Sequence, residues 1–170
     1  MNASIHNRWS ALQVLEKYSL MRAPVDVERL CLQLELSIIR TDFVENEAQI
    51  GGAEISGMLY VYENGKGTIY VREHDPDVRQ RFTIAHELGH YFLHYTAGES
   101  TTFVSLRRSR SARETEANAF AAELLMPEAL IYGENDLHFF PSISHLSTRL
   151  KVSKEAMRYR LDGLGLYYVE

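Results

Sequence analysis

The chain has 170 residues, of which 45% are hydrophobic and 24% charged, and a formal net charge of −5. Its length is that of one domain with its own core, and its composition excludes a wholly disordered chain, a collagen-like fibre and a long coiled coil. The negative charge argues against a dedicated nucleic-acid binder, because such proteins usually carry a basic excess. We therefore expect one domain over residues 1–170.

The sequence lacks the features of an exported or membrane-bound protein. Cys31 is the only cysteine, which excludes an internal disulfide framework and fits a reducing compartment. No segment approaches the roughly 18 consecutive apolar residues of a membrane span. Polar and charged side chains interrupt the first 20 residues, which have no apolar core of a signal peptide. We expect a cytoplasmic protein without membrane contact.

Apolar residues at helical spacing predict two helices near the N-terminus. The first contains Trp9, Leu12, Leu15 and Tyr18. The second is expected to open at Pro24 and to bury a face made of Val27, Leu30, Cys31 and Leu34. In this interpretation Cys31 is a small apolar core residue and carries no chemistry.

A β-rich region follows these helices. Residues 37–41 predict a short strand, and the polar, glycine-containing residues 45–54 predict a loop. Residues 57–62 and 68–71 are rich in Tyr, Val and Ile and flank Asn64-Gly65, a pattern typical of a β-hairpin. This is the strand pair that the sequence predicts most strongly.

The rest of the chain predicts helices separated by one long loop. Asp75-Pro76 is typical of a helix start with Asp75 as N-cap, so a helix is expected over about 76–95. Residues 97–112 lack periodicity and predict a loop, and a second long helix over about 111–126 stops at Pro127. Short helices are expected near 128–132, 142–150 and 153–163. Helices and strands are segregated along the chain, which predicts the α+β class.

His86-Glu87-Leu88-Gly89-His90 is an HExxH sequence inside the first long helix. Histidines four residues apart lie on one helix face, about 6 Å apart along the axis, and can converge on one Zn²⁺. Glu87 could then take a proton from the attacking water. Two surface histidines on an amphipathic helix would give the same short motif. The flanking residues are apolar nearly all round, however, and polar groups on a buried helix need partners, which a metal ion supplies.

His94 is a poor candidate for a third ligand. It lies eight residues past His86, which is about 12 Å along the axis of a straight helix, too far for both to bind one ion. We therefore assign His94 a structural role, and expect the third ligand from another helix.

The helix over 111–126 supplies that ligand. Glu114, Ala117, Asn118 and Ala121 share one face by their spacing, and the two alanines would allow a close approach to the histidine helix. Glu114 is the candidate ligand, and Asn118 would hydrogen-bond a metal-binding side chain. Glu116 is the nearest rival and is expected to face solvent. Glu114 and Glu116 could also be present only because acidic residues are favourable near a helix N-terminus. That interpretation would not explain why Ala117 and Ala121 share a helix face with Glu114.

Together the two helices resemble a known family. The run RFTIAHELGH over 81–90, followed by Glu114-x-x-Ala117-Asn118 and a helix ending at Met126-Pro127, is similar to the ImmA/IrrE family of metallopeptidases. The similarity extends from about residue 8 to 166 and includes the closing residues 152–165. It implies a zincin-like helical core with a small β-sheet and C-terminal helices.

The resemblance also implies an activity. Its members are gluzincin-like zinc endopeptidases that act on helix-turn-helix repressors. Carried over to this sequence, His86, His90 and Glu114 are the ligands of one Zn²⁺ per chain, and Glu87 is the general base. The implied role is that of an anti-repressor in phage, mobile-element or stress regulation.

Two questions stay open in the sequence. The residue that would stabilise the oxyanion is not fixed by the motif. Tyr132, His138 and His145 are candidates, but a structural role is favoured for each. A different class of protein, a metal-stabilised regulatory module that binds a repressor or DNA without cutting, would use the same ligands. Glu87 favours the enzyme, because binding alone needs no general base.

Two basic segments have no assigned role. Residues 107–113 contain Arg107, Arg108, Arg110 and Arg113. Such a run is usually a solvated loop, and the alternative is a contact with substrate or nucleic acid at the rim of the cleft. Residues 142–166 resemble a helix-turn-helix, with Lys154, Arg158 and Arg160 as possible DNA contacts. We expect these helices to pack on the catalytic domain, and expect no direct nucleic-acid binding.

Overall fold

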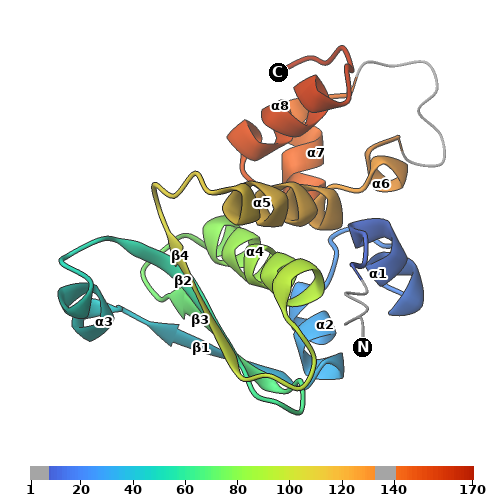
Figure 1. Ribbon diagram of the computed structural model, residues 1–170. Coiled ribbons are helices and arrows are strands. Elements are labelled where there is room, and N and C mark those ends of the chain that lie inside the picture. The colour runs from blue at the N-terminus through green and yellow to red at the C-terminus, as the bar shows by residue number, and fades with distance from the viewer. Residues whose placement is uncertain (1–7, 133–140) are drawn as a thin grey trace.

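The computed structural model of the protein describes residues 8–132 and 141–170. Figure 1 shows a small β-sheet with most of the helices gathered on one side of it. The strands are β1 (Leu36–Thr41), β2 (Ile55–Val61), β3 (Gly67–Arg72) and β4 (Thr101–Leu106). The helices are α1 (Ala11–Lys17), α2 (Val27–Gln33), α3 (Val44–Gln49), α4 (Asp77–His94), α5 (Ala112–Leu125), α6 (Glu128–Tyr132), α7 (Ile143–Leu150) and α8 (Lys154–Gly163). The class is therefore α+β, as the sequence predicts.

The sheet is mixed, with strand order β1-β3-β2-β4. β1 runs parallel to β3, whereas β2 is antiparallel to both β3 and β4. Buried and partly buried residues alternate along β2, because successive side chains point to opposite faces of the sheet. α4 lies along the covered face, and β4 forms the edge of the sheet nearest to α5 (Figure 1).

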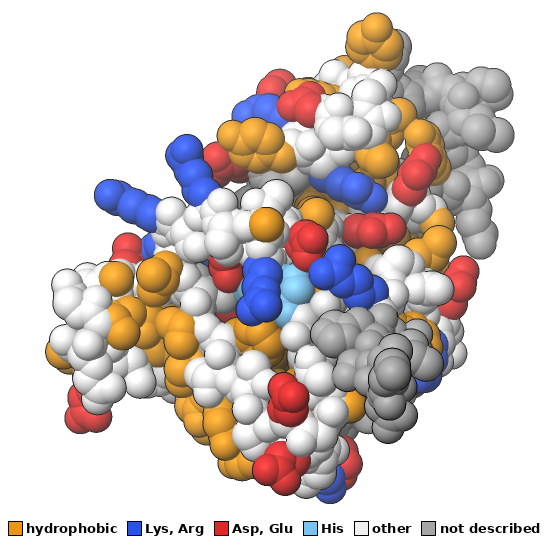
Figure 2. Space-filling view, viewed as in Figure 1, with side chains coloured by type: hydrophobic (Ala, Val, Ile, Leu, Met, Phe, Trp, Pro, Cys, Tyr) orange, Lys and Arg blue, Asp and Glu red, His pale blue; other side chains and the backbone are white. Residues whose placement is uncertain are grey.

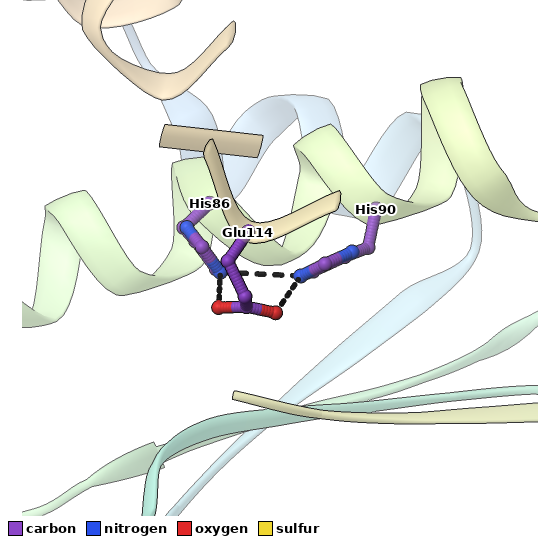
Figure 3. Close-up of side chains that lie close together, drawn as sticks. All are labelled: His86, His90 and Glu114. Atoms are coloured by element: carbon purple, nitrogen blue, oxygen red, sulfur yellow. Dashed lines mark hydrogen bonds and ion pairs between the residues drawn. The ribbon is translucent and has the colours of Figure 1, made fainter. Parts of the chain in front are cut away.

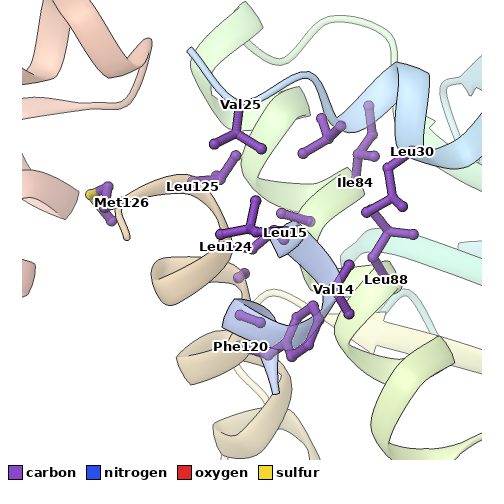
Figure 4. Close-up of a cluster of buried hydrophobic side chains, with 14 of the residues drawn as sticks. Val14, Leu15, Val25, Leu30, Ile84, Leu88, Phe120, Leu124, Leu125 and Met126 are labelled. Atoms are coloured by element: carbon purple, nitrogen blue, oxygen red, sulfur yellow. The ribbon is translucent and has the colours of Figure 1, made fainter. Parts of the chain in front are cut away.

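A hydrophobic core lies between the helices on that side of the sheet. Figure 4 shows Leu15 of α1, Leu30 of α2, Leu88 of α4 and Leu124 of α5 among its members, and all four are fully buried. Cys31 is buried in the same core, as predicted. No helix in residues 8–132 or 141–170 combines the length and the apolar character needed to cross a membrane.

α4 and α5 approach each other closely at Gly89. A Cβ built at this position would lie 3.0 Å from both the Cα and the backbone oxygen of Ala117. A side chain there would push the two helices apart, since neither of these backbone atoms can move alone. The close approach brings Glu114, in the first turn of α5, over the face of α4 that carries His86 and His90.

Two segments predicted as loops contain regular structure. Residues 45–54 overlap α3, where the Glu47 carboxylate accepts a hydrogen bond from the Ile55 backbone N–H at 2.8 Å and also pairs with Arg72. Residues 97–112 contain β4, which pairs with β2. Both predictions are wrong because the stabilising partners are distant in sequence.

One predicted helix start and one predicted N-cap are also wrong. α2 begins after Asp26, whose side chain caps it, so Pro24 precedes the helix and does not open it. The N-cap of α4 is Pro76, with no side-chain cap. The carboxylate of Asp75 instead accepts a hydrogen bond from Arg107 at 2.6 Å, and this bond ties the start of α4 to the end of β4.

The C-terminal helices α7 and α8 contribute to the same core. Their buried residues are Ile143, Leu146, Leu150, Val152, Met157 and Leu161. Arg160 donates a hydrogen bond to the backbone carbonyl of Met126 at 3.0 Å, and Arg158 pairs with Glu170 at 2.8 Å. Two of the three basic residues that the sequence offered for DNA contact are therefore engaged within the protein.

Candidate metal centre

Three side chains from α4 and α5 converge on one point (Figure 3). The Nε2 atom of His86 lies 3.2 Å from one oxygen of Glu114, and the Nε2 atom of His90 lies 3.0 Å from the other. The two Nε2 atoms are 3.2 Å apart. All three residues are buried. Two imidazole nitrogens and a carboxylate at this spacing could hold a metal ion.

Helix geometry produces this convergence. His86 and His90 are one turn apart on α4, so their rings project from the same face. α5 begins after Ser111, whose hydroxyl accepts a hydrogen bond from the backbone N–H of Glu114 at 3.3 Å. This cap fixes the start of the helix, and with it the direction in which Glu114 points.

The orientation of the donors fits a metal of the zinc type. The Nδ1 atom of His86 lies 2.9 Å from the amide oxygen of Asn118, and the Nδ1 atom of His90 lies 2.9 Å from the Nδ1 atom of His94. The second nitrogen of each ring is thus occupied away from the cluster, which leaves both Nε2 atoms directed at Glu114. Two histidines and one carboxylate are a ligand set of catalytic zinc sites, which keep a further position open.

Glu87 is fully buried beside the three convergent side chains. Neither of its carboxylate oxygens has a hydrogen-bond partner among the described residues. Burial raises the pKa of Glu87 to about 7, against the opposing charge of His86. A buried carboxyl group with a pKa near neutrality is suited to accept a proton and release it again.

The convergent side chains differ in their protonation. Burial alone would raise the pKa of Glu114, but hydrogen bonds from His86 and His90 outweigh it and lower this pKa to about 2. Burial lowers the pKa of His90 and outweighs its hydrogen bond to Glu114. Burial also acts to lower the pKa of His86, but the neighbouring Glu114 and Glu87 raise it overall. An ionised Glu114 and a neutral His90 are the forms that bind a metal.

Two residues of β4 lie at the cluster and are missed by the sequence analysis. The hydroxyl oxygen of Ser105 lies 3.1 Å from the Nε2 atom of His86 and 3.5 Å from that of His90. The ring of Phe103 stacks on His90, with centroids 5.1 Å apart. Both were hidden by the prediction of a loop. The alternating run TTFVSL over 101–106 is the signal that could have revealed a strand.

The expectation that Glu116 faces solvent is correct only in part. Its side chain is 44% exposed, yet one carboxylate oxygen lies 2.9 Å from the Nε2 atom of His94. This hydrogen bond lowers the pKa of Glu116. The His94 side chain is only 2% exposed, and its ring lies between Glu116 and His90.

The candidate oxyanion residues do not join this cluster in the part of the chain that the structure describes. Tyr132 on α6 and His145 on α7 are exposed and form no hydrogen bond or ion pair there with His86, Glu87, His90 or Glu114. His138 lies outside the described residues. The role of each stays a prediction.

The arginines of residues 107–113 divide into two kinds. Arg107 is partly buried and bonded to Asp75 at 2.6 Å and to Glu54 at 2.5 Å, so it is part of the framework. Arg108, Arg110 and Arg113 are exposed. On the face drawn in Figure 2, Lys and Arg side chains flank the small area of exposed histidine surface.

An HExxH helix crossed by a second helix that brings a carboxylate to its histidines defines a metallopeptidase-type centre. The chain belongs to the peptidase M78 family: residues 41–162 match its IrrE N-terminal-like domain. The match includes Glu87 and the three convergent side chains, and it confirms the ImmA/IrrE resemblance. The family supports a metallopeptidase-type function with a protein substrate. No curated protein matches the chain.

Proposed function

We propose that the protein is a zinc endopeptidase that cleaves a helix-turn-helix transcriptional repressor in the cytoplasm and so relieves repression. The observation that carries the enzymatic part is the buried, unpartnered carboxyl group of Glu87 beside His86, His90 and Glu114. The choice of a repressor as substrate rests on the family resemblance of the sequence.

Each residue of the centre has a distinct role in this proposal. His86, His90 and Glu114 would hold the ion, and Asn118 would fix the ring of His86. A bound Zn²⁺ supplies Lewis acidity that polarises a peptide carbonyl and acidifies water. Glu87 accepts a proton from the attacking water and passes it to the nitrogen of the leaving amine. Burial raises the pKa of Glu87 above that of an exposed glutamate, which makes its carboxylate a better proton acceptor.

The edge strand β4 offers a place for an extended substrate. It pairs with β2 on one side only within the described residues, so its outer edge is open to a further strand. Main-chain hydrogen bonds to such an edge are a general mode of peptide binding. A peptide bound there would pass close to the cluster, since Ser105 of β4 lies within 3.5 Å of the Nε2 atoms of both His86 and His90.

The non-proteolytic regulatory module is the competing proposal. Such a module would need His86, His90 and Glu114 but not Glu87. A buried carboxyl group without a hydrogen-bond partner destabilises a fold, so its presence is better explained by a chemical role.

Incubation with purified helix-turn-helix repressors, starting with any that is encoded beside this protein, followed by mass spectrometry, tests the proposal. With zinc present, the wild-type protein should cut the repressor at a defined bond. Glu87→Gln should bind zinc and the repressor but leave the repressor intact. A chelator should stop cleavage by the wild type. Intact repressor with the zinc-loaded wild type, or equal cleavage by Glu87→Gln, would contradict the proposal.

A further inference from the structure

A cavity of about 660 Å³ lies beside the first half of α4, apart from the candidate metal centre. Its walls also include the segment that leads into α2, the strand β1 and the residue that ends α7. None of the four residues of the metal centre lines it: His86, Glu87, His90 and Glu114. The volume is in the range of sites that bind small organic ligands.

The lining of this cavity combines buried apolar side chains with an excess of positive charge. The buried apolar side chains belong to Leu20, Val25 and Ile84. The cations are Arg22, Arg29, Arg40, Arg81 and Lys151, and the carboxylates are Asp26, Glu28 and Asp77. The lining therefore carries two more positive than negative charges, in a chain whose net charge is −5.

The charge of Arg81 has no carboxylate partner within the described residues. Its partly buried guanidinium donates hydrogen bonds to the backbone carbonyls of Val25 at 3.0 Å and of Lys151 at 3.2 Å. Burial lowers the pKa of Arg81, and the charges of Asp26 and Glu28 offset this only in part. Because a guanidinium has five N–H donors, Arg81 keeps donors for an anion that enters the cavity.

The carboxylates of the lining leave other cations unpaired as well. Glu28 pairs with Arg40 at 2.9 Å, and Asp26 accepts a hydrogen bond from a backbone N–H at the start of α2. In residues 8–132 and 141–170, three cations of the lining form no side-chain hydrogen bond or ion pair: Arg22, Arg29 and Lys151. An anionic ligand would supply the charge that these side chains lack.

We propose that this cavity binds a small organic anion, a phosphate monoester with an apolar body. A phosphate monoester carries a charge of about −1.5 to −2 at neutral pH and three strong acceptor oxygens, which matches the two excess positive charges of the lining. Leu20, Val25 and Ile84 would contact the apolar body. The proposal requires neither zinc nor peptidase activity, so its failure would leave the proposed function untouched.

Lys151 offers a substitution that removes a cation and preserves the fold. It ends α7 with a φ of 51°, in the left-handed region where glycine is favoured. Its backbone carbonyl, which accepts from Arg81, is kept in Lys151→Gly. We therefore expect this variant to unfold at the wild-type temperature or above it, so that a loss of anion binding cannot be attributed to unfolding.

Isothermal titration calorimetry with phenyl phosphate, on zinc-free protein dialysed free of chelator, tests the proposal. One phenyl phosphate should bind per chain, and more tightly than inorganic phosphate, because the cavity removes the phenyl ring from water. Lys151→Gly combined with Arg22→Gln should weaken this binding about 10-fold, the loss expected when charged hydrogen-bond donors are removed. Zinc-loaded protein should bind phenyl phosphate at the same cavity with the same affinity.

A control variant distinguishes the cavity from a general attraction of anions to positive charge. Lys154→Gln combined with Arg108→Gln removes the same total charge at exposed positions outside the lining, and should bind phenyl phosphate as the wild type does. The proposal is overturned if zinc-free protein does not bind phenyl phosphate, or if the control weakens binding as much as the cavity variant. Equally tight binding of inorganic phosphate would overturn the assignment of an organic ligand.

Discussion

The backbone of Gly57 lies directly against the carboxyl group of Glu87. A Cβ at this position would fall 2.6 Å from a carboxylate oxygen of Glu87 and 2.5 Å from the γ-methyl carbon of Thr83. Gly57 is in the middle of β2, so the sheet leaves just the space that the buried carboxyl group occupies. The position of Glu87 therefore depends on the absence of a side chain at Gly57 as well as on its place in α4.

Gly57→Ala is expected to displace Glu87 and leave the metal ligands in place. A misplacement of about 1 Å can lower the rate of a reaction about 100-fold, so the peptidase kcat should fall strongly while zinc affinity changes little. Gly163→Ala is the matched control, because a Cβ there meets nothing within 4 Å. Parallel measurements of kcat and zinc affinity check the prediction, and equal losses of both would contradict it.

Glu87→Gln should stabilise the metal-free protein at neutral and alkaline pH. The pKa of Glu87 rises from 4.5 to about 7 on folding, so the folded state holds this proton more tightly than the unfolded state. The contribution of Glu87 to stability is then fully present below about pH 4.5 and is lost as the pH rises toward about 7, by an amount on the order of 3 kcal/mol. Gln carries no charge to bury, so the variant avoids this loss.

Thermal unfolding in the presence of a chelator measures this effect. The difference in Tm between Glu87→Gln and the wild type should grow between about pH 5 and about pH 8. Glu155→Gln, at an exposed position of α8, should give no such trend. A wild-type Tm equal to or above that of Glu87→Gln at the higher pH would show that the buried carboxyl group is not a source of instability.

The ligands are expected to rank in a definite order. His86→Ala, His90→Ala and Glu114→Ala should each remove most zinc binding, because each deletes a donor. Asn118→Ala should weaken it by about 10- to 100-fold, since it removes only the partner of a ligand. Metal analysis after dialysis checks this order.

The His94 and Glu116 variants complete this ranking. His94→Ala should weaken zinc binding without abolishing it, which modifies the expectation of a purely structural His94. A larger loss in Glu116→Ala than in Glu114→Ala would show that the assignment of the third ligand is wrong.

Much of the centre could be predicted because its signals are local. The spacing of His86 and His90 and the shared helix face of Glu114 and Asn118 follow from 3.6 residues per turn. The contacts of Ser105 with His86 and of Glu116 with His94 join elements far apart in the chain, and no local pattern predicts them.

The fold likewise contains elements that the local sequence predicts and elements that depend on distant partners. The hairpin of β2 and β3 is predicted from its turn residues, whereas β4 becomes a strand through pairing with β2. The N-cap expected at Asp75 is wrong for a related reason, because its carboxylate pairs with Arg107, which follows β4.

The exposed arginines near the centre give a prediction about substrate binding. Arg108→Ser combined with Arg110→Ser should either reduce cleavage of the repressor, through a higher KM, or have no effect. Arg107 is left unchanged, because its removal would break the ion pairs that it forms with Glu54 and Asp75 at the end of β4. Specific DNA binding with nanomolar affinity at about 150 mM salt, measured by gel shift, would contradict this interpretation.

Anomalous diffraction at the zinc edge from crystals grown with Zn²⁺ tests the metal centre most directly. We expect one strong peak per chain, about 2.0–2.2 Å from the Nε2 atoms of His86 and His90 and from a carboxylate oxygen of Glu114. The same crystals should show Glu87 near the ion but not bound to it. No peak at this point, or a zinc ion bound by other residues, would show that these side chains do not form the metal centre.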